Sequence, residues 1–306
     1  MNINRNTKTA ILVMLIILLI VFCPNMENEA CIFIGIASVV ILAANYLFEK
    51  HYKGKGEIET FITNKLSSIE IGRGAAGVVY ILPQLLPNYA FKISTDMGTC
   101  RKWQKEYQIT LDIQKAVNIE VEYVRFAKIK SYKSNESECV MQMQRVIHPD
   151  DKNHMIHTMF SDLNKDFYTE KRGTSLGYNQ LLKYLSPEKI KSIFKDLGRF
   201  MAYMHLVAKF DGKDIELLLG RTTTDPELRI YIVDFDQVNP VTDYSDESID
   251  NISVCMGDIQ YFPNTDVPDY QVFHDAYLSA GIEFGMEENA KKIITRYYDS
   301  YAAPLG

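Results

Sequence analysis

Two closely spaced segments decide the fold: residues 211–218 read DGKDIELL, and residues 229–236 read RIYIVDFD. Both combine an aliphatic run typical of a buried strand with acidic side chains at one end of that run. Asp211, Lys213 and Glu216 are separated by two and then three positions, and Asp234 ends the second run. A strand that ends in a carboxylate is a common way to present a metal ligand, although such an aspartate also caps turns. The motifs upstream decide between these interpretations.

A glycine-rich segment lies earlier in the chain, between the strand-like runs IEI and VVYIL. Gly72, Gly74 and Gly77 form the pattern G-x-G-x-x-G-x-V with Val79. Glycines leave backbone amides open to phosphate oxygens because no side chain obstructs the approach. Glycines also occur in hairpin turns for steric reasons alone. The segment predicts a phosphate-binding turn only in combination with further residues.

Those further residues are a strand lysine and a helix glutamate. Lys92 lies in the strand-like run AFKI, where a charged side chain is costly unless it has anionic partners. Residues 101–117 then predict a helix, and its apolar positions at three- and four-residue spacing place Glu106 beside Trp103 and Ile113. We expect Glu106 to point inward and pair with Lys92. The alternative is a solvated glutamate on a basic helix.

Taken in order, these motifs resemble those of protein kinases over residues 67–238. The resemblance implies a two-lobed α+β fold, with a β-rich lobe at 67–147 and a reduced helical lobe at 148–306, that uses ATP and Mg²⁺. More narrowly, DGKDIELLLG followed by IVDFDQV is similar to a fungal family of uncharacterised kinase-like domains. In that family an acid commonly replaces the metal-binding asparagine.

The resemblance also implies a role for each matching residue. The expected nucleotide-binding residues are Gly72, Gly74, Gly77, Val79, Lys92 and Glu106. Asp211 is expected to orient the acceptor hydroxyl and Lys213 to steady the transferred phosphoryl group, so both are expected catalytic residues. Glu216 and Asp234 are the expected Mg²⁺ ligands.

Several positions depart from the kinase pattern. Lys209 and Phe210 replace the usual histidine and arginine before the catalytic aspartate, so regulation by phosphorylation of the activation loop is not expected. Glu216 replaces an asparagine, and Asp236 replaces the glycine of D-F-G. No A-P-E signature follows, and only 306 − 236 = 70 residues remain after Asp236. The platform for a protein substrate must therefore be reduced.

Three functions remain open from the sequence. The first is ATP- and Mg²⁺-dependent phosphotransfer to a hydroxyl group, with a membrane-proximal protein as the expected substrate. The second is a catalytically impaired pseudokinase that acts as a membrane-tethered binding scaffold, which the substitutions at Lys209, Phe210, Glu216 and Asp236 favour. The third is a small-molecule kinase of the aminoglycoside or choline type, because such enzymes also lack A-P-E.

Two apolar runs occupy the N-terminal part of the chain, at residues 10–23 and 31–48. As helices they would be about 21 and 27 Å long, close to the bilayer core of about 30 Å. Arg5 and Lys8 precede the pair, Lys50 and Lys53 follow it, and the connector is acidic. The positive-inside tendency then predicts a two-helix transmembrane hairpin at residues 1–50 whose two ends are cytoplasmic. A linker is expected at 51–66.

Two other interpretations of these runs are open. Residues 1–23 match a signal peptide in their basic start and short apolar stretch, although no A-x-A-like cleavage site follows. Both runs could also be buried helices of a globular core. Under either membrane topology the lysines after the second run place the kinase-like domain in the cytoplasm.

The overall composition limits the remaining choices. The formal net charge of −6 gives no basic field for nucleic acid, so no nucleic-acid partner is expected. The five cysteines show no metal-binding spacing and no disulfide framework, which favours a reducing cytosolic environment. His148, His154 and His157 lie close together in sequence, but no matching acid or cysteine pattern accompanies them. We expect them in a polar loop or at the start of a helix.

Overall fold

The computed structural model describes residues 56–74, 77–116, 119, 121–169, 173–257 and 261–302. The predicted transmembrane runs at 10–23 and 31–48 lie outside these residues. No helix within the described ranges is both long and apolar enough to cross a membrane. The chain divides into two compact units, Met1–Thr60 and Phe61–Gly306, and the elements that form the site belong to the second.

Part of the expected linker at 51–66 is helical. Helix α3 spans Glu57–Thr63, and a 3-10 turn covers Lys65–Ser67. Phe61 is fully buried and stacks on Phe91 with ring centroids 4.2 Å apart. This stacked pair stabilises α3. The polar, glycine-containing sequence of the expected linker does not indicate a helix there.

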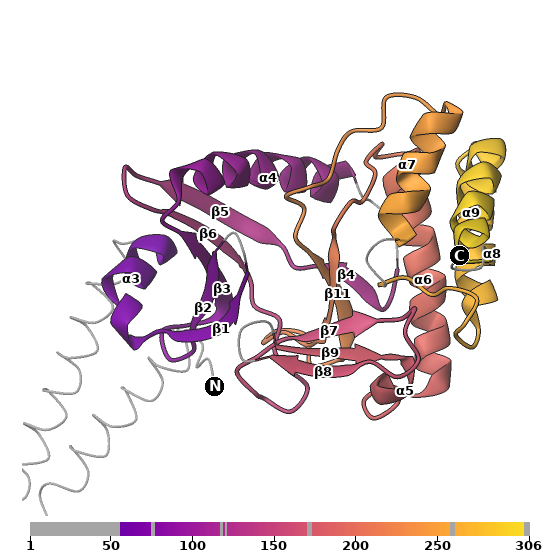
Figure 1. Cartoon of the computed structure of the whole chain (residues 1–306). Coiled ribbons are helices and arrows are strands. Elements are labelled where there is room, and N and C mark those ends of the chain that lie inside the picture. Colours follow the sequence, from indigo (N-terminus) through magenta and orange to yellow (C-terminus); the bar gives the residue numbers. More distant parts are fainter. Residues whose placement is uncertain are drawn as a thin grey trace, which may run out of the picture. The chain divides into compact units, whose positions relative to one another are not determined.

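The first lobe consists of an antiparallel sheet and one long helix (Figure 1). In the described residues this sheet has the order β1-β2-β3-β6-β5. Its strands are β1 (Ile69–Arg73), β2 (Val78–Leu82), β3 (Leu86–Ser94), β5 (Ile129–Ser134) and β6 (Cys139–Gln144). Helix α4 (Met97–Ala116) packs against β3, β5 and β6. Asp96 precedes it and accepts a hydrogen bond from the Thr99 N–H at 2.6 Å, which satisfies an amide of the first turn.

The structure contains a second, mixed sheet. Its described strands run in the order β4-β11-β10-β7-β9-β8. They are β4 (Val124–Phe126), β7 (Ile156–Met159), β8 (Asp166–Thr169), β9 (Gly173–Gly177), β10 (Glu216–Gly220) and β11 (Arg229–Val233). The strands expected in DGKDIELL and RIYIVDFD are β10 and β11; they pair antiparallel, whereas β4 pairs parallel with β11.

Strands β7, β8 and β9 differ from the helical lobe expected at 148–306. They are short, and their sequences IHTM, DFYT and GTSLG carry little hydrophobic alternation. Gly173 adopts a φ of 86°, and a Cβ on Gly177 would lie 2.2 Å from the Asp162 carbonyl oxygen. These close contacts are made with backbone segments outside the strands themselves. The local sequence pattern therefore does not predict β7, β8 and β9.

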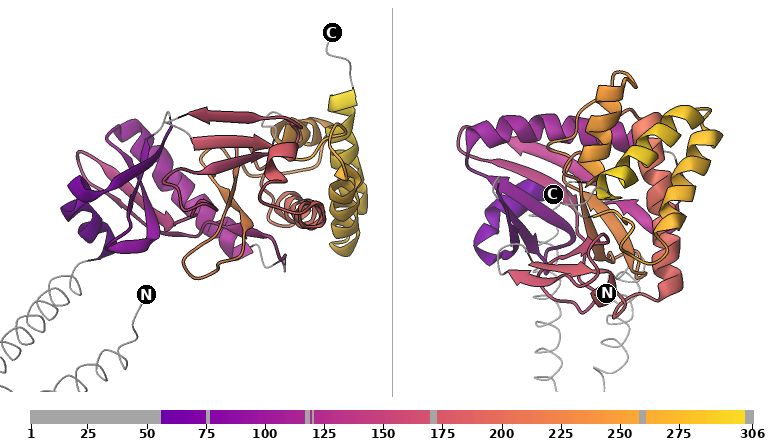
Figure 2. Two further views of the ribbon diagram at one scale, coloured as in Figure 1. Left: turned by 90° about the horizontal axis from the view of Figure 1, so that it is seen from below. Right: turned by 45° about the vertical axis from the view of Figure 1, so that its right-hand side comes forward.

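The second lobe is built around helix α6 (Pro187–Leu206) (Figure 2). Ser186 caps its N-terminus by accepting from the Lys189 N–H at 3.2 Å, and Pro187 occupies its first turn. α6 packs closely on α8 (Tyr270–Glu283) at Gly198, where a Cβ would lie 2.4 Å from the Phe273 carbonyl oxygen. The remaining helices are α5 (Tyr178–Leu181), α7 (Asp246–Gly257) and α9 (Glu287–Ala302).

A disulfide connects α4 to the first sheet. Cys100 in the first turns of the helix bonds to Cys139 at the start of β6, with their Cα atoms 5.6 Å apart. Both residues are buried. The expectation of no disulfide framework is therefore wrong for this pair, and it no longer supports a reducing cytosolic environment. The two cysteines are 39 positions apart, and only the packing of α4 on β6 brings them together.

Candidate functional site

A narrow cavity lies between the two sheets. Its enclosed volume is about 80 Å³. Its described walls are mostly apolar, and at one end it meets the charged side chains of Lys92, Glu106, Glu216 and Asp234. The apolar walls come from both sheets: Ile71, Val79, Ala90, Met143, Leu218 and Val233. Five residues predicted from separate motifs, Val79 and these four charged residues, thus line one space.

Lys92 is the centre of the charged end. Its Nζ lies 3.0 Å from Asp234 Oδ1 and 3.5 Å from Glu106 Oε2, and it sits 4.9 Å from the centroid of the Trp103 ring. Burial on its own would lower the pKa of Lys92, but attraction by the carboxylates of Asp234 and Glu106 raises it above its usual value. The lysine therefore keeps its positive charge in the cavity.

Glu106 faces inward from α4, as the helical spacing predicts, and is 2% exposed. Burial raises the pKa of Glu106 to about 7, because the interior disfavours its carboxylate more than Lys92 stabilises it. Asp234 contributes by repulsion. Among the described residues, Glu106 Oε2 has no hydrogen-bond partner within the usual limits, apart from its ion pair with Lys92. The interpretation of Glu106 as a solvated glutamate disagrees with this burial.

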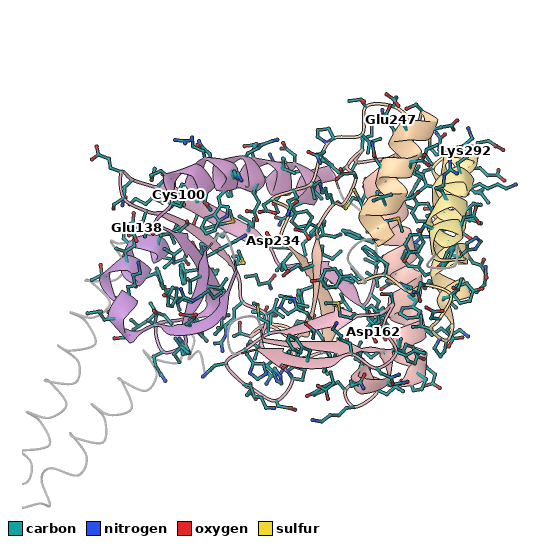
Figure 3. The ribbon with its side chains drawn as sticks, in the orientation of Figure 1. Cys100, Glu138, Asp162, Asp234, Glu247 and Lys292 are labelled. Atoms are coloured by element: carbon teal, nitrogen blue, oxygen red, sulfur yellow. A yellow bond between two sulfur atoms is a disulfide. The ribbon has the colours of Figure 1, made fainter. Side chains whose placement is uncertain are left out.

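Asp234 follows β11 directly and projects between the two lobes (Figure 3). Its φ of 62° is left-handed, which directs the backbone away from the strand at this point. Asp236 and Asp214 lie near enough to be affected by its charge. Burial and then repulsion by Asp234 raise the pKa of both carboxyl groups. Asp214 was not among the predicted site residues, although it lies inside the DGKD motif.

Glu216 is the first residue of β10 and lines the same cavity as Asp234. Its Oε2 lies 3.5 Å from Nδ1 of the buried His157. In the described part of the chain, no group of three or more His, Cys, Asp or Glu side chains is arranged to hold a metal ion. Mg²⁺ is usually held by one or two carboxylates together with substrate phosphates and waters. Glu216 and Asp234 fit that donor set.

The glycine-rich segment closes the end of the β1–β2 hairpin. Gly72 pairs with Val79, and the Gly74 N–H donates to the Gly77 carbonyl at 2.9 Å. Residues 75 and 76 lie outside the described residues. A Cβ on Gly77 would lie 2.4 Å from the Ile93 carbonyl oxygen and 2.6 Å from the Trp103 ring, whereas one on Gly74 would meet nothing within 4 Å. Gly77 thus has a packing role beside any contact with phosphate.

The hydrogen bonds to the Asp211 carboxylate come from Lys213 and Asn239. Its Oδ1 accepts from the backbone N–H groups of Lys213 at 3.0 Å and Asn239 at 2.9 Å. Its Oδ2 accepts from Asn239 Nδ2 at 3.1 Å. The Asp211 N–H in turn donates to the Asn239 carbonyl at 3.0 Å. No sequence motif singled out Asn239, because it lies beyond the D-F-D segment at an offset with no assigned role.

The loop that carries Asp211 is conformationally unusual. Lys209, Gly212 and Asp214 have φ values of 58°, 67° and 59°. Left-handed conformations of non-glycine residues cost free energy, and they persist where surrounding contacts enforce them. Here Phe210 forms a β-bridge with Pro240, and the Val241 N–H donates to the Lys209 carbonyl at 2.8 Å. The backbone is therefore fixed on both sides of Asp211.

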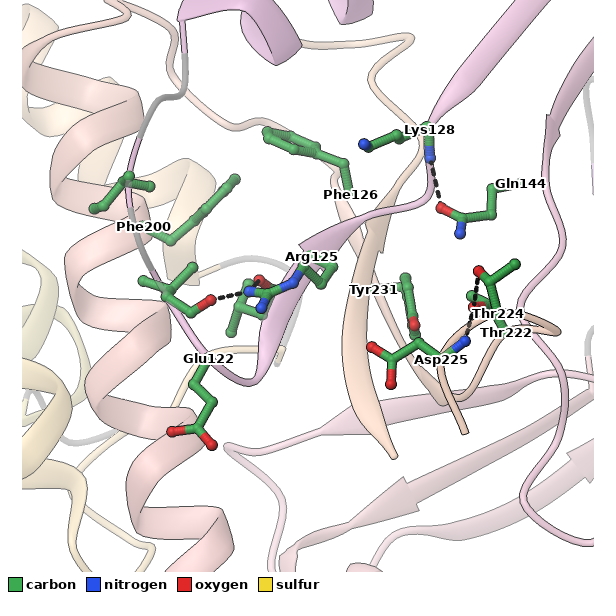
Figure 4. Close-up of a pocket in the computed structure, with 13 residues that line it drawn as sticks. Glu122, Arg125, Phe126, Lys128, Gln144, Phe200, Thr222, Thr224, Asp225 and Tyr231 are labelled. Carbon is green, nitrogen blue, oxygen red and sulfur yellow. Dashed lines mark hydrogen bonds between the residues drawn. The ribbon is translucent and has the colours of Figure 1, made fainter. Parts of the chain in front are cut away.

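A larger cavity, of about 730 Å³, lies elsewhere (Figure 4). Arg125, Lys128 and Gln144 line it on one side, and Thr222 and Asp225 contribute from the β10–β11 loop. The Arg125 guanidinium is turned toward the Val121 and Val124 carbonyls, and Asp225 is paired with Arg229 at 2.6 Å. None of the residues predicted from the motifs lines this cavity.

Comparisons with known proteins supply little beyond this geometry. No protein-family model matches the chain, and no curated protein sequence matches it. Among solved structures, it is similar to the kinase domain of Mycobacterium tuberculosis PknI, crystallised as a double mutant. The two are 10% identical, with a TM-score of 0.36, and the match covers 76% of this chain and 96% of the other. A match of this size carries no functional argument.

Proposed function

We propose that the second unit is a protein-kinase-like phosphotransferase that transfers the γ-phosphoryl group of ATP to a hydroxyl acceptor. The observation that carries the proposal is the position of Lys92 between Glu106 and Asp234, at 3.5 and 3.0 Å. These three residues come from a strand, a helix and a second sheet. Protein kinases use the same combination to hold nucleotide phosphates and metal.

Each residue has a defined task in this proposal. The apolar walls contributed by Val79, Ala90 and Leu218 accept the nucleotide base, and Lys92 binds the phosphates. Glu216 and Asp234 would hold Mg²⁺, which when bound neutralises charge on the phosphates. Asp211 accepts the proton of the attacking hydroxyl.

The cavity at Lys92 is smaller than a usual nucleotide site. Pockets for ligands of nucleotide size usually measure about 300–1,000 Å³, and this one encloses about 80 Å³. The two sheets must therefore move apart when the nucleotide enters, as lobes do in hinged enzymes. The ion pair between Lys92 and Asp234 must open at the same time, so that phosphate and metal can take over its contacts.

The cellular setting is part of the proposal. The uninterrupted apolar runs at 10–23 and 31–48 and the lysines after them support a membrane anchor with the kinase-like domain on the cytoplasmic side. The net charge of −6 supports a function without nucleic acid.

The test compares three forms of the full chain in detergent. For wild type, MgATP at about 100 times its dissociation constant should stabilise the fold by about 2.7 kcal/mol, visible as a higher unfolding temperature. Lys92→Ala should lose this stabilisation because the phosphates lose their cation. Asp211→Asn should keep the stabilisation but lose ATP turnover, measured as ADP release, because it cannot take up the hydroxyl proton. No stabilisation of wild type by any nucleotide, with or without divalent metal, would refute the proposal.

A second candidate is a pseudokinase scaffold, and one contact favours it. Glu216 stands where kinases have an amide, and its carboxylate already contacts His157 at 3.5 Å. If this contact persists when nucleotide binds, the metal loses a ligand. The scaffold predicts MgATP stabilisation of the wild type with no ADP release above that of Asp211→Asn.

A further inference from the structure

A second cavity, of about 340 Å³, begins at Asp211 on the side of the catalytic loop that faces α7. Asp211 and Lys213 form one wall, the segment 239–242 forms another, and Ser248, Asn251 and Cys255 of α7 complete it. Its volume lies within the range of small-molecule sites. Figure 1 shows α7 standing beside the long connection that leaves β11.

Asp211 has one acceptor position left for a molecule in this cavity. An ionised carboxylate offers about four lone-pair sites. Among the described groups, three are used: the N–H groups of Lys213 and Asn239 bind Oδ1, and Asn239 Nδ2 binds Oδ2. A hydroxyl group that enters the cavity can donate to the remaining site on Oδ2. Asn239 therefore fixes which oxygen of the carboxylate receives the acceptor.

The chain after the D-F-D segment folds back on the loop that carries Asp211. Residues 237–245 separate Asp236 from the start of α7, and they turn back onto the catalytic loop through the Phe210–Pro240 bridge. Val241 adds a hydrogen bond to the Lys209 carbonyl. The segment then enters α7, whose side chains wall the cavity. The space beside Asp211 is therefore bounded on one side by this helix.

The charge of the walls narrows the class of acceptor. Of the described residues that line the cavity, Asp211 and Lys213 carry charge, one of each sign. Thr242, Ser248 and Asn251 offer uncharged hydrogen-bonding groups, and Ile252 and Val254 add apolar surface. Among the described lining residues, a cationic amine would find one carboxylate, that of Asp211. A multiply charged anion would find one cation, the ammonium group of Lys213. Uncharged hydroxyl groups match these walls best.

From these observations, and resting on the proposed kinase-like function, we propose that this cavity is the acceptor site and that it takes a small, uncharged, polyhydroxylated molecule. In the transfer, the acceptor oxygen forms a bond to the γ-phosphorus while the bond from that phosphorus to the β,γ-bridging oxygen breaks. Asp211 takes the hydroxyl proton. The products are the phosphate monoester and ADP, and no further reactant is needed.

The experiment measures ADP release by the full chain in detergent with MgATP and a panel of acceptors. The panel contains neutral polyols and monosaccharides, amino alcohols, sugar acids, and serine- or threonine-containing peptides. We expect a neutral polyol or sugar to stimulate ADP release at least about tenfold, with the phosphate monoester detected by mass spectrometry. Stimulation by peptides alone, or by none of the panel while MgATP still stabilises the fold, would overturn the proposal.

Two variants of α7 locate the site. Asn251→Leu fills the cavity from an exposed helix position and removes an amide, so KM for the acceptor should rise about tenfold or more, the equivalent of at least one hydrogen bond. KM for ATP should not change. Glu247→Leu is the matched control: it is exposed on the same helix outside the cavity lining and should leave both KM values unchanged.

The outcomes separate this inference from the function on which it rests. If wild type shows no MgATP stabilisation, the phosphotransferase proposal itself fails. If MgATP stabilises the protein and Asn251→Leu leaves the acceptor KM unchanged, the acceptor lies elsewhere and only the present inference fails. Alkylation of Cys255, which lines the cavity, gives an independent reading: a bound acceptor should slow its modification by N-ethylmaleimide, whereas MgATP alone should not.

Discussion

At the scale of single residues, Gly77 shows how closely the glycine-rich turn is packed. A Cβ at this position would lie within 2.6 Å of both the Ile93 carbonyl and the Trp103 ring. Trp103 is fully buried and also supports Lys92. Because Gly77 has no side chain, the turn can pack directly against Trp103, which lies on the same helix as Glu106.

We predict that Gly77→Ala lowers the free energy of unfolding by about 1–3 kcal/mol, the usual cost of an overpacked site. Gly74→Ala is the matched control, because a Cβ there meets nothing within 4 Å. Denaturant unfolding of the two variants measures the difference. Equal stabilities would show that Trp103 moves freely, contrary to the packing described above.

At the scale of elements, the disulfide ties the helix that carries Glu106 to the sheet that carries Lys92. Cys100 lies one helical turn before Trp103 and about two turns before Glu106. Cys139 lies on β6, which pairs with β3 next to Lys92. The bond therefore limits how far α4 can move from the sheet.

Replacing both cysteines, Cys100→Ser with Cys139→Ser, should lower the free energy of unfolding by about 4 kcal/mol in the chain-entropy model for a loop of this length. The sequence separation that defines the loop is 39 residues. A dithiol reductant should lower the stability of the wild type and leave the double variant unaffected. Cys255→Ser, which replaces a thiol outside the disulfide, is the control and should behave as wild type. A reductant effect of equal size in the double variant would contradict the prediction.

At the scale of the whole molecule, the buried Glu106 links stability to pH. Its pKa is raised from 4.5 to about 7 on folding. Between these values the folded state binds more protons than the unfolded state, so its stability falls as pH rises. The contribution of Glu106 is complete below about pH 4.5 and is lost as pH passes through about 7.

We therefore predict that wild type loses stability relative to Glu106→Gln when the pH is raised from 5 to 8 in the absence of nucleotide. The size of this relative loss follows from the pKa difference and is roughly 3 kcal/mol. Denaturant unfolding at the two pH values measures it. Asp214 and Asp236 are present in both proteins, so only the part of their titration that is coupled to Glu106 differs between the two. Parallel pH profiles for the two proteins would show that Glu106 keeps its ordinary pKa.

Much of the charged site is contained in local sequence. The apolar surroundings of Lys92, the helical spacing that turns Glu106 inward and the acidic end of β11 at Asp234 each have a local physical reason. Residue type and periodicity therefore suffice to predict that these side chains face the interior. The strand pair β10–β11 follows from the same patterns.

Other features depend on residues that are distant in sequence. Asn239 orients Asp211 only because the chain after Asp236 folds back on the catalytic loop, and Cys100 meets Cys139 only because α4 packs on β6. The strands β7 to β9 are too short for a periodic signal and are stabilised by their neighbours. Sequence patterns report the preference of each segment for burial, whereas tertiary packing decides which buried segments meet. The cavity beside Asp211, formed by a loop and a helix with no shared motif, belongs to the second kind.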